Sequence, residues 1–248
     1  MSAVAQIPRG KALARSTARL LVAVAALALA GCAHGRTRTY PPDWFAPVRD
    51  PHPPTWEILP QAAAPGEVIL SKRNELGILS NFAPTPFEYR GKRYASVEGF
   101  WQMMHYPEPK VDGKRDPRAR LSKAAWPHTR DEVAAMVAFE AKKAGDVGEA
   151  NEAKLGIDWV SFEGRKLPYR SAIPGEHYRL IREAMVAKLN QNPEVRRILL
   201  ATGDLVLRPD HHGEVNSPPE WHYDRIWMEL RAELQGRNFA GAGKATPR

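Results

Sequence analysis

The sequence has only one cysteine, Cys32, in 248 residues. With no second thiol the chain cannot form an internal disulfide, so its folded part must be stabilised by packing. Long apolar runs are also scarce. The run at residues 20–29 is well short of the roughly 20 residues that a membrane-spanning helix needs, which argues against a transmembrane anchor.

The N-terminus instead has the order of a secretory signal. Basic residues precede the apolar run, with no acidic residue among them: Arg9, Lys11, Arg15 and Arg19. The run ends at Leu29-Ala30-Gly31-Cys32, which resembles a lipobox, so we expect residues 1–31 to be a lipoprotein signal peptide and Cys32 to be lipidated. Acidic residues after the cysteine of such signals favour inner-membrane retention. Ala33 follows here, so the expected location is the outer membrane, facing the periplasm.

The excess of positive charge gives little support for a nucleic-acid partner. Four charges of the net +8 belong to the signal, which leaves about +4 for the rest of the chain. The basic residues are scattered and mixed with Asp and Glu. Such a surface suits anionic lipid or a phosphate-bearing ligand, and we do not expect nucleic-acid binding.

Three further segments follow the signal. Residues 32–66 are rich in proline and have no helical or strand period, so we expect an extended tether. It holds three bulky aromatic residues, Trp44, Phe45 and Trp56. These either pack back onto the domain or move with the tether, because an isolated tryptophan seldom stays solvated without a partner. Residues 67–236 are long enough for one core, and residues 237–248 are an expected flexible tail.

The residue pattern of the domain predicts an α+β fold that is predominantly helical, with a small β-sheet. Residues 67–70 form a strand candidate, and residues 87–94 alternate around a glycine turn as a hairpin does. Helices are expected at residues 96–105, 129–144, 176–190, 194–201 and 223–234.

Local signals support two of these helices. Thr129 and Glu132 have the spacing of a capping box, and Pro193 stands where a first-turn proline is tolerated. One face of the helix at 176–190 is apolar at spacings of three and four, through Tyr178, Ile181, Met185 and Leu189. We expect that face to be buried.

Two segments carry the residues suited to chemistry. The first has a Ser-Asn-Phe turn at 80–82, a Gly-Lys pair at 91–92, and a Ser-x-Glu at 96–98 followed four residues later by Gln102. The second runs from residue 199 to Asp210 and closes with Ile-Trp-Met-Glu-Leu-Arg at 226–231. Together they resemble the NADAR family over roughly residues 67–234.

That resemblance implies chemistry at an N-glycosidic bond. Members of the family cleave ribosylated pyrimidine intermediates of riboflavin synthesis, and others remove ADP-ribose from guanine bases. The implied fold is small and α+β, the pocket accepts a ribose phosphate or an ADP-ribose-like molecule, and neither a metal nor another cofactor is expected.

Carboxylates suit this reaction, because positive charge builds on the sugar and negative charge on the leaving base. Glu98 begins a helix, where partial burial would raise its pKa and let it protonate the base, while Asp210 would position water or stabilise the cation. Structural alternatives exist for both. Glu98 favours the positive end of its helix in any case, and Asp210 is a common turn residue.

Five further residues are candidates for binding the substrate: Asn81, Phe82, Trp101, Gln102 and Trp221. Asn81 would donate to a phosphate or hydroxyl, and Phe82 would stack on a base. Trp101 and Gln102 follow Glu98 by three and four positions, so they share its helix face. Trp221 would close over the ligand. Turn, core and anchoring roles are the alternatives.

His105 departs from the family pattern. Members commonly have a lysine seven residues after the glutamate, where its amine can attack an opened ribose. A histidine cannot form that imine. Either the carboxylates act with His105 as an acid–base group, or the protein binds without cleaving. His211 and His212 do not predict a metal site, because adjacent histidines diverge on an extended chain.

Three functions remain open. The favoured one is an N-glycosidase for a ribosylated base or an ADP-ribosyl substrate, carried by a membrane-anchored lipoprotein. The second is a non-catalytic lipoprotein that binds ADP-ribose or a nucleotide, and the third is a structural envelope lipoprotein.

Overall fold

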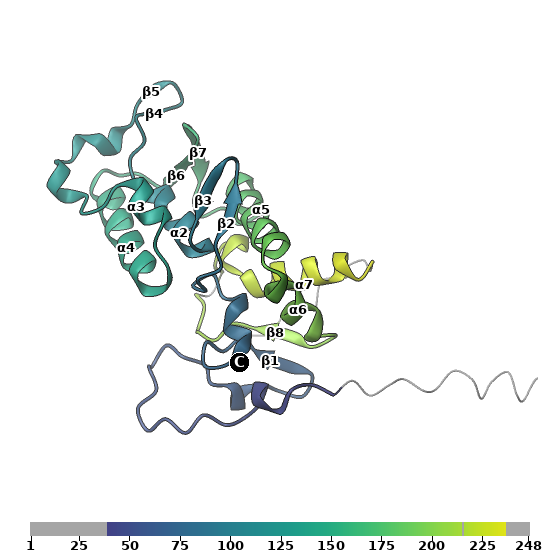
Figure 1. Ribbon diagram of the computed structural model, residues 1–248. Helices are drawn as coiled ribbons and strands as arrows, with labels where there is room; N and C mark the ends of the chain where they lie inside the picture. Colours follow the sequence, from purple (N-terminus) through teal and green to yellow (C-terminus); the bar gives the residue numbers. More distant parts are fainter. Residues whose placement is uncertain (1–38, 215, 237–248) are drawn as a thin grey trace, which may run out of the picture. The chain divides into compact units, whose positions relative to one another are not determined.

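The computed structural model describes residues 39–214 and 216–236 (Figure 1). The predicted signal peptide at 1–31, the lipidation site Cys32 and the tail at 237–248 lie outside the described residues. The described chain from Tyr40 onward belongs to one compact unit. Within it, no helix is long and apolar enough to cross a membrane.

The unit is α+β and predominantly helical, as the sequence pattern predicts. Its α-helices are α2 (Val97–Gln102), α3 (Arg130–Ala134), α4 (Ala138–Lys154), α5 (Glu176–Gln191), α6 (Pro193–Ala201) and α7 (Tyr223–Leu234). The 3-10 helices of the described residues are short: η1 (Pro42–Trp44), η2 (Pro60–Ala62), η3 (Glu75–Leu79), η4 (Met103–His105), η5 (Pro117–Arg120), η6 (Lys123–Ala125) and η7 (Pro219–Trp221).

The strands form separate two-stranded ladders rather than a single sheet. They are β1 (Glu67–Ile69), β2 (Phe87–Tyr89), β3 (Lys92–Tyr94), β4 (Lys110–Val111), β5 (Lys114–Arg115), β6 (Trp159–Phe162), β7 (Arg165–Pro168) and β8 (Val206–Arg208). β1 pairs with β8 in parallel, whereas β2–β3, β4–β5 and β6–β7 are antiparallel hairpins. The parallel pair brings residues 67–69 next to residues 206–208, which lie far apart in the sequence.

The predicted hairpin at 87–94 is confirmed. Phe87 pairs with Tyr94, and their stacked rings lie 5.6 Å apart between centroids. Arg90 and Gly91 both have positive φ, at 49° and 74°. Two such residues form the tight turn whose twist matches an antiparallel pair.

The single helix predicted at 129–144 is wrong, because the chain breaks between α3 and α4. The Thr129–Glu132 capping box begins α3 as expected. The backbone after it bonds to the Ser-Asn-Phe segment and its neighbours instead of continuing the helix. The Ala134 carbonyl accepts from the Ala95 N–H at 3.2 Å, and the Ala138 N–H donates to the Phe82 carbonyl at 3.2 Å. The break therefore ties the start of α4 to the predicted site.

The proline-rich segment packs onto the unit from Tyr40 onward. Trp44 is 1% exposed, and its Nε1 donates to Glu75 at 2.7 Å. A β-bridge joins Glu57 to His211. These contacts make the segment a wall of the folded unit.

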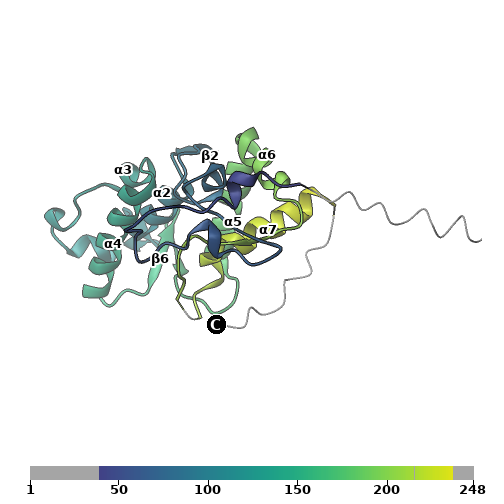
Figure 2. The ribbon, with the colours of Figure 1, turned by 90° about the horizontal axis from the view of Figure 1, so that it is seen from below.

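Helix α2 lies between α4 on one side and α5 on the other, and both helices contact it (Figures 1 and 2). Every residue of α2 is buried. Gly145 of α4 faces α2, where an added Cβ would lie 1.7 Å from the Gln102 side chain, and Gly148 faces η4, where an added Cβ would lie 2.6 Å from that of His105. The glycines therefore permit the close approach of the two helices.

Candidate functional site

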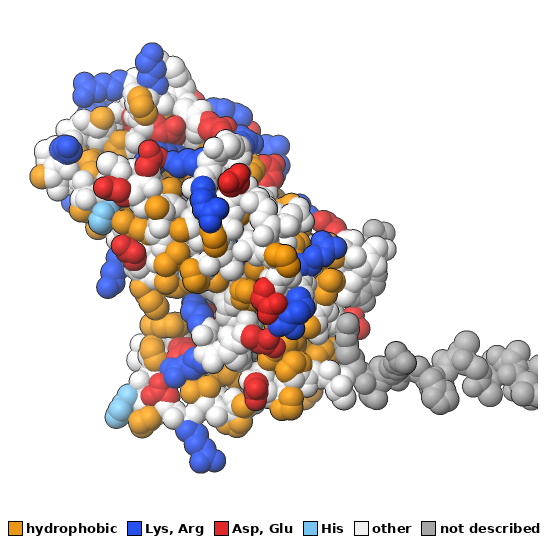
Figure 3. Space-filling view, in the orientation of Figure 1, with side chains coloured by type: hydrophobic (Ala, Val, Ile, Leu, Met, Phe, Trp, Pro, Cys, Tyr) orange, Lys and Arg blue, Asp and Glu red, His pale blue; other side chains and the backbone are white. Residues whose placement is uncertain are grey.

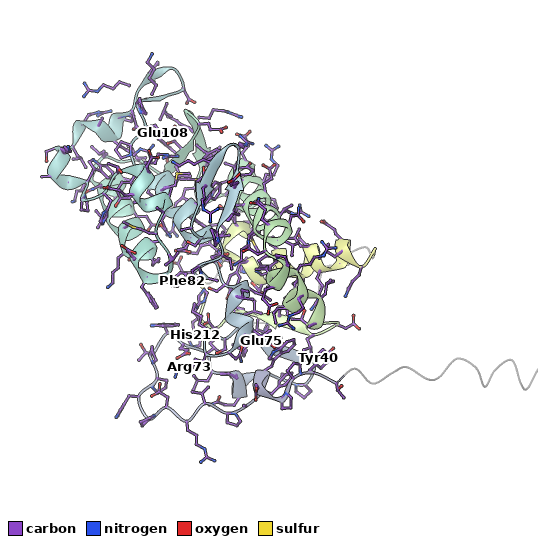
Figure 4. The ribbon with its side chains drawn as sticks, viewed as in Figure 1. Tyr40, Arg73, Glu75, Phe82, Glu108 and His212 are labelled. Atoms are coloured by element: carbon purple, nitrogen blue, oxygen red, sulfur yellow. The ribbon has the colours of Figure 1, made fainter. Side chains whose placement is uncertain are left out.

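A cavity of about 430 Å³ opens beside α2. Six predicted site residues line it: Asn81, Phe82, Glu98, Trp101, Gln102 and Trp221. Phe82 and His212, which also lines the cavity, lie close together in Figure 4, whereas Glu108 lies at the far end of the unit. The surface nearby is hollowed, with hydrophobic side chains on its rim and a basic side chain inside (Figure 3).

Glu98 enters the cavity from the first turn of α2. The Ser96 hydroxyl caps this helix by accepting from the Gly99 N–H at 2.9 Å, and the Glu98 N–H donates to the Asn81 carbonyl at 3.0 Å. The Glu98 residue is 6% exposed. Its burial raises the pKa to about 7, against the opposing effects of a Gln102 hydrogen bond and of nearby Lys142, His211 and Lys72. A large share of Glu98 is therefore protonated near neutral pH.

Gln102 fixes this carboxyl group. Its Nε2 donates to Glu98 Oε1 at 2.8 Å, one helical turn away. Space for the amide exists because residue 145 is glycine. The Asn81 Oδ1 and Gln102 Oε1 atoms are buried and have no hydrogen-bond partner within the described chain. Gln102 Oε1 faces Gly145 of α4, so of these two acceptors Asn81 Oδ1 is the one suited to a ligand hydroxyl or amine.

The Ser-Asn-Phe turn is held from beneath. Trp227 Nε1 donates to the Leu79 carbonyl at 2.6 Å, and Lys188 Nζ donates to the Ser80 carbonyl at 2.8 Å. Lys188 is fully buried, and this desolvation lowers its pKa to about 7. Two consecutive carbonyls are thus fixed by α5 and α7, which keeps Asn81 and Phe82 at the cavity wall.

Asp210 does not line the cavity. It is 0% exposed and binds Lys72 Nζ through both carboxylate oxygens, at 2.6 and 2.7 Å. Burial alone would raise its pKa, but the His211 hydrogen bond and the charge and hydrogen bonds of Lys72 outweigh burial and hold the pKa below its usual range. Asp210 is therefore ionised, and it reaches the cavity through Lys72, which does line it.

His105 also lies outside the cavity lining. Its side chain is fully buried in η4, and its Nδ1 lies 2.6 Å from Glu152 Oε2. Arg118 binds the other oxygen of Glu152 at 3.1 Å. The nearest link to the cavity is Glu149, whose Oε1 is 3.7 Å from His105 Nε2. The structure thus brings neither His105 nor Asp210 to the cavity surface.

Aromatic side chains also line the cavity. Trp101 contacts His177 edge to face at 5.3 Å, and Trp221 lies under the Arg170 guanidinium at 4.9 Å. The Tyr169 hydroxyl donates to Glu149 Oε1 at 2.6 Å, and burial raises the pKa of this phenol. Trp221 therefore belongs to the wall, next to the N-terminus of α7.

Several lining residues have no signal in the sequence. They are Trp56, Lys72, Phe139, Lys142, Glu149, Tyr169 and Arg170, and they come from distant segments. Trp56 is the exception in part, because an isolated tryptophan in a proline-rich stretch is a candidate for packing. Within residues 39–214 and 216–236 no group of three or more His, Cys, Asp or Glu residues is placed to hold a metal ion.

Comparison with protein-family models finds no match, and none of the curated proteins matches the chain. Among solved structures, the chain is similar to the NMR structure of the E. coli protein YbiA, with 18% identity and a TM-score of 0.37. The match covers 71% of this chain and 88% of that one. The site described above rests on the residues of this chain alone.

Proposed function

We propose that the compact unit is an N-glycosidase, which hydrolyses the bond between ribose and a base in a ribosylated base or an ADP-ribosyl substrate. The observation that carries the proposal is Glu98, a carboxyl group in a cavity wall whose pKa burial raises to about 7. Such a group both donates and accepts a proton near neutral pH. The resemblance to the NADAR family implies the same chemistry.

Breaking the bond from the ribose anomeric carbon to nitrogen leaves the electron pair on the base and positive charge on the sugar. Protonated Glu98 gives its proton to that nitrogen, so an amine-linked pyrimidine or guanine leaves neutral, whereas the nicotinamide of NAD leaves neutral without a proton. Water then adds to the sugar carbon and loses a proton. We assign that proton to Glu149, a further carboxylate in the cavity lining, held by the Tyr169 hydroxyl.

Other groups in the cavity suit a ribose phosphate. Asn81 offers a buried Oδ1 without a partner among the described residues, which would accept from a sugar hydroxyl. Phe82 offers a ring for a base. Lys72 and Lys142, which pair with Asp210 and Asp146, line the same cavity, and a phosphate would accept a further N–H from each ammonium.

The position of His105 favours the second candidate, a binding protein without turnover. Its side chain is fully buried and paired with Glu152, away from the cavity lining. Helix α2 and η4 thus present no amine for attack on an opened ribose. Under this alternative the same cavity binds ADP-ribose or a nucleotide and releases it unchanged.

A measurement of base release distinguishes the N-glycosidase from the binding protein. The full chain is incubated with ribosylamino-pyrimidine phosphate, NAD, ADP-ribose and ADP-ribosylated guanine, and free base is measured by chromatography. Glu98→Gln should lose at least about 100-fold in rate, the scale of general acid catalysis. Glu88→Gln, an exposed glutamate of β2, is the matched control and should retain the rate. Full turnover in Glu98→Gln would contradict the proposal, and ligand binding without base release would favour the binding protein.

We also propose that a lipid on Cys32 holds the unit at the outer membrane, facing the periplasm. The order of basic region, apolar run and lipobox supports this. Cys32→Ala should move the protein from the membrane fraction to the soluble fraction. Ala33→Asp is the matched control and should keep the protein in the membrane fraction while shifting it to the inner membrane. Membrane retention of Cys32→Ala would contradict the anchor.

A further inference from the structure

The hairpin β4–β5 lies at one end of the compact unit, and its exposed side chains are strongly basic (Figure 1). Three of them are cations, Lys110, Lys114 and Arg115, and Figure 3 shows Lys and Arg side chains gathered at the same end. None of the three forms an ion pair within the part of the chain that the structure describes. Exposed cations elsewhere commonly have an acidic partner, as Arg90 has Glu163. The hairpin therefore carries uncompensated positive charge.

A fourth exposed cation, Lys166 of β7, lies beside the hairpin. Its N–H donates to Asp112 Oδ1 at 3.3 Å, and the Asp112 N–H donates to the Gly164 carbonyl at 2.7 Å. The Lys166 ammonium lies 4.8 Å from the centre of the Trp159 ring and has no acidic partner among the described residues. We call the four cations the basic corner: Lys110, Lys114, Arg115 and Lys166.

The acidic residues near the corner do not neutralise it, because backbone groups already bind them. Glu108 Oε2 accepts from the Gly164 N–H at 2.8 Å, and Asp116 Oδ2 accepts from the Glu108 N–H at 2.8 Å. Asp116 also accepts from the buried Arg118 side chain at 2.9 Å. Together with Asp112, these acids hold the loops together from inside. The cations of the corner remain accessible to a partner outside.

Two of the cations face each other directly. Lys110 and Arg115 are paired residues of the antiparallel ladder β4–β5. Side chains at such positions have Cβ atoms about 5 Å apart, and like charges there are destabilising. Each strand of this hairpin has only two residues, so few ladder contacts offset the repulsion. An anion bound at the two cations would remove it.

The corner suits an anionic lipid surface better than a nucleic acid. Single-stranded nucleic acid is commonly bound by exposed aromatic side chains on which its bases stack. The large hydrophobic residues that the described chain exposes are all outside the corner: Phe45, Trp56, Phe139 and Ile173. Lipid headgroups require only accessible cations, and clusters of Lys and Arg are typical of contacts with anionic lipid.

We propose that the basic corner binds the phosphate groups of an anionic lipid bilayer. The contact is electrostatic and peripheral, because Val111, the one apolar residue of the hairpin, is buried and leaves no side chain to insert. It goes beyond the proposed function, since none of the four cations lines the cavity beside α2. With a lipid on Cys32, the corner gives the unit a second contact with the membrane and limits its rotation on the tether.

Vesicle sedimentation tests the proposal. The full chain with Cys32→Ala carries no lipid of its own. Its binding is compared on vesicles of phosphatidylcholine alone and of phosphatidylcholine mixed with phosphatidylglycerol. The mixed vesicles should bind it more tightly, and this preference should fall as salt is added. Adding Lys110→Gln/Lys114→Gln/Arg115→Gln should weaken binding to the mixed vesicles roughly 100-fold, which is about fivefold for each cation removed.

The matched control is Arg49→Gln/Arg196→Gln/Arg225→Gln, which removes the same charge from exposed residues of other segments. It should bind the mixed vesicles within about twofold of the parent chain. Equal losses in the two triple variants would overturn the corner, as would binding that does not distinguish the two kinds of vesicle. Tighter binding of an RNA oligonucleotide than of the mixed vesicles would also overturn it, by assigning the corner to nucleic acid.

A second measurement needs no lipid. Arg115→Glu introduces an acid opposite Lys110, so hydrogen exchange of the hairpin amides should slow, while binding to the mixed vesicles falls. Exchange that does not slow would show that the two cations do not repel each other, and would contradict an anion site between them. Base release is measured separately and should be unchanged in all these variants, so the corner and the N-glycosidase fail separately.

Discussion

Two buried carboxyl groups, Glu98 in the cavity lining and Asp210 behind the lining residue Lys72, have opposite properties. Glu98 on α2 is 6% exposed, and Asp210 beside β8 is 0% exposed. Glu98 accepts a hydrogen bond from a neutral amide and has a raised pKa. Asp210 binds the Lys72 ammonium through both oxygens and has a lowered pKa.

This difference shows that burial alone does not determine the protonation state. Desolvation acts on both groups in the same direction, toward the neutral acid. At Asp210 the His211 hydrogen bond, together with the charge and hydrogen bonds of Lys72, outweighs burial, whereas at Glu98 the Gln102 hydrogen bond and the charges of nearby basic groups do not. Glu98 is therefore suited to proton transfer, and Asp210 to holding the positive charge of Lys72 at the cavity.

The largest expected effect comes from removing the cation. Lys72→Met removes the ammonium from the buried Asp210 carboxylate and leaves it the His211 ring at 3.3 Å, so we expect about 3 kcal/mol less free energy of unfolding at neutral pH. Urea denaturation measures the loss. The double variant Lys72→Met/Asp210→Asn has no buried charge to compensate and should recover most of the stability. If the single variant were as stable as the double, Lys72 would not be the partner that keeps Asp210 ionised.

The next variant, Glu98→Gln, is expected to be more stable than the wild-type protein. The pKa of Glu98 is about 7 in the fold and 4.5 in the reference state. Between these values the unfolded chain loses the proton and the fold keeps it, so the wild-type protein loses stability as pH rises from 4.5 to 7. Glu98→Gln lacks this dependence and should be more stable than wild type by about 3 kcal/mol at pH 8.

At pH 4 the difference in stability between Glu98→Gln and the wild-type protein should be close to zero, because the wild-type side chain is then protonated in both the folded and the unfolded state. Denaturation at the two pH values gives the comparison, with Glu88→Gln as the exposed control. A stability gain that does not change with pH would mean that Glu98 titrates normally.

A smaller loss of stability is expected when the packing around Gln102, which holds Glu98, is disturbed. Gly145→Ala would place a Cβ 1.7 Å from Gln102 Oε1, so the amide must move away from Glu98. We expect a loss of about 1–3 kcal/mol from overpacking and a displaced Glu98 titration. Gly213→Ala, which meets nothing within 4 Å, is the control for thermal unfolding. Equal melting temperatures for the two variants would contradict the tight α2–α4 contact.

Much of the fold could be predicted from local sequence signals. The hairpin at 87–94, the Thr129–Glu132 capping box and the helix at 223–234 each depend on residues close together in the chain, and each is present. The break between α3 and α4 could not be predicted. It arises because backbone groups of residues 134–138 bond to residues 82–96, a contact that no local pattern records.

The candidate site likewise has a part that the sequence predicts and a part that it does not. Asn81, Phe82, Glu98 and Gln102 lie on one short stretch, so a motif places them together. Their partners do not follow from any spacing. Lys72 and Asp210 meet because β1 pairs in parallel with β8 across the length of the domain. His105 shows the converse, since its position along the helix suggested the cavity and its ring packs against Glu152 instead.

The contrast between the two carboxyl groups is tested most directly by their own titration. Carbon-13 NMR of the full chain, labelled at the side-chain carboxyl carbons of Glu and Asp, is followed from pH 3 to 9, with Glu98→Gln and Asp210→Asn used to assign the two signals. The account predicts a Glu98 midpoint near 7 and an Asp210 midpoint below its reference value of 3.8. A Glu98 midpoint near 4.5 would contradict its role as the proton donor.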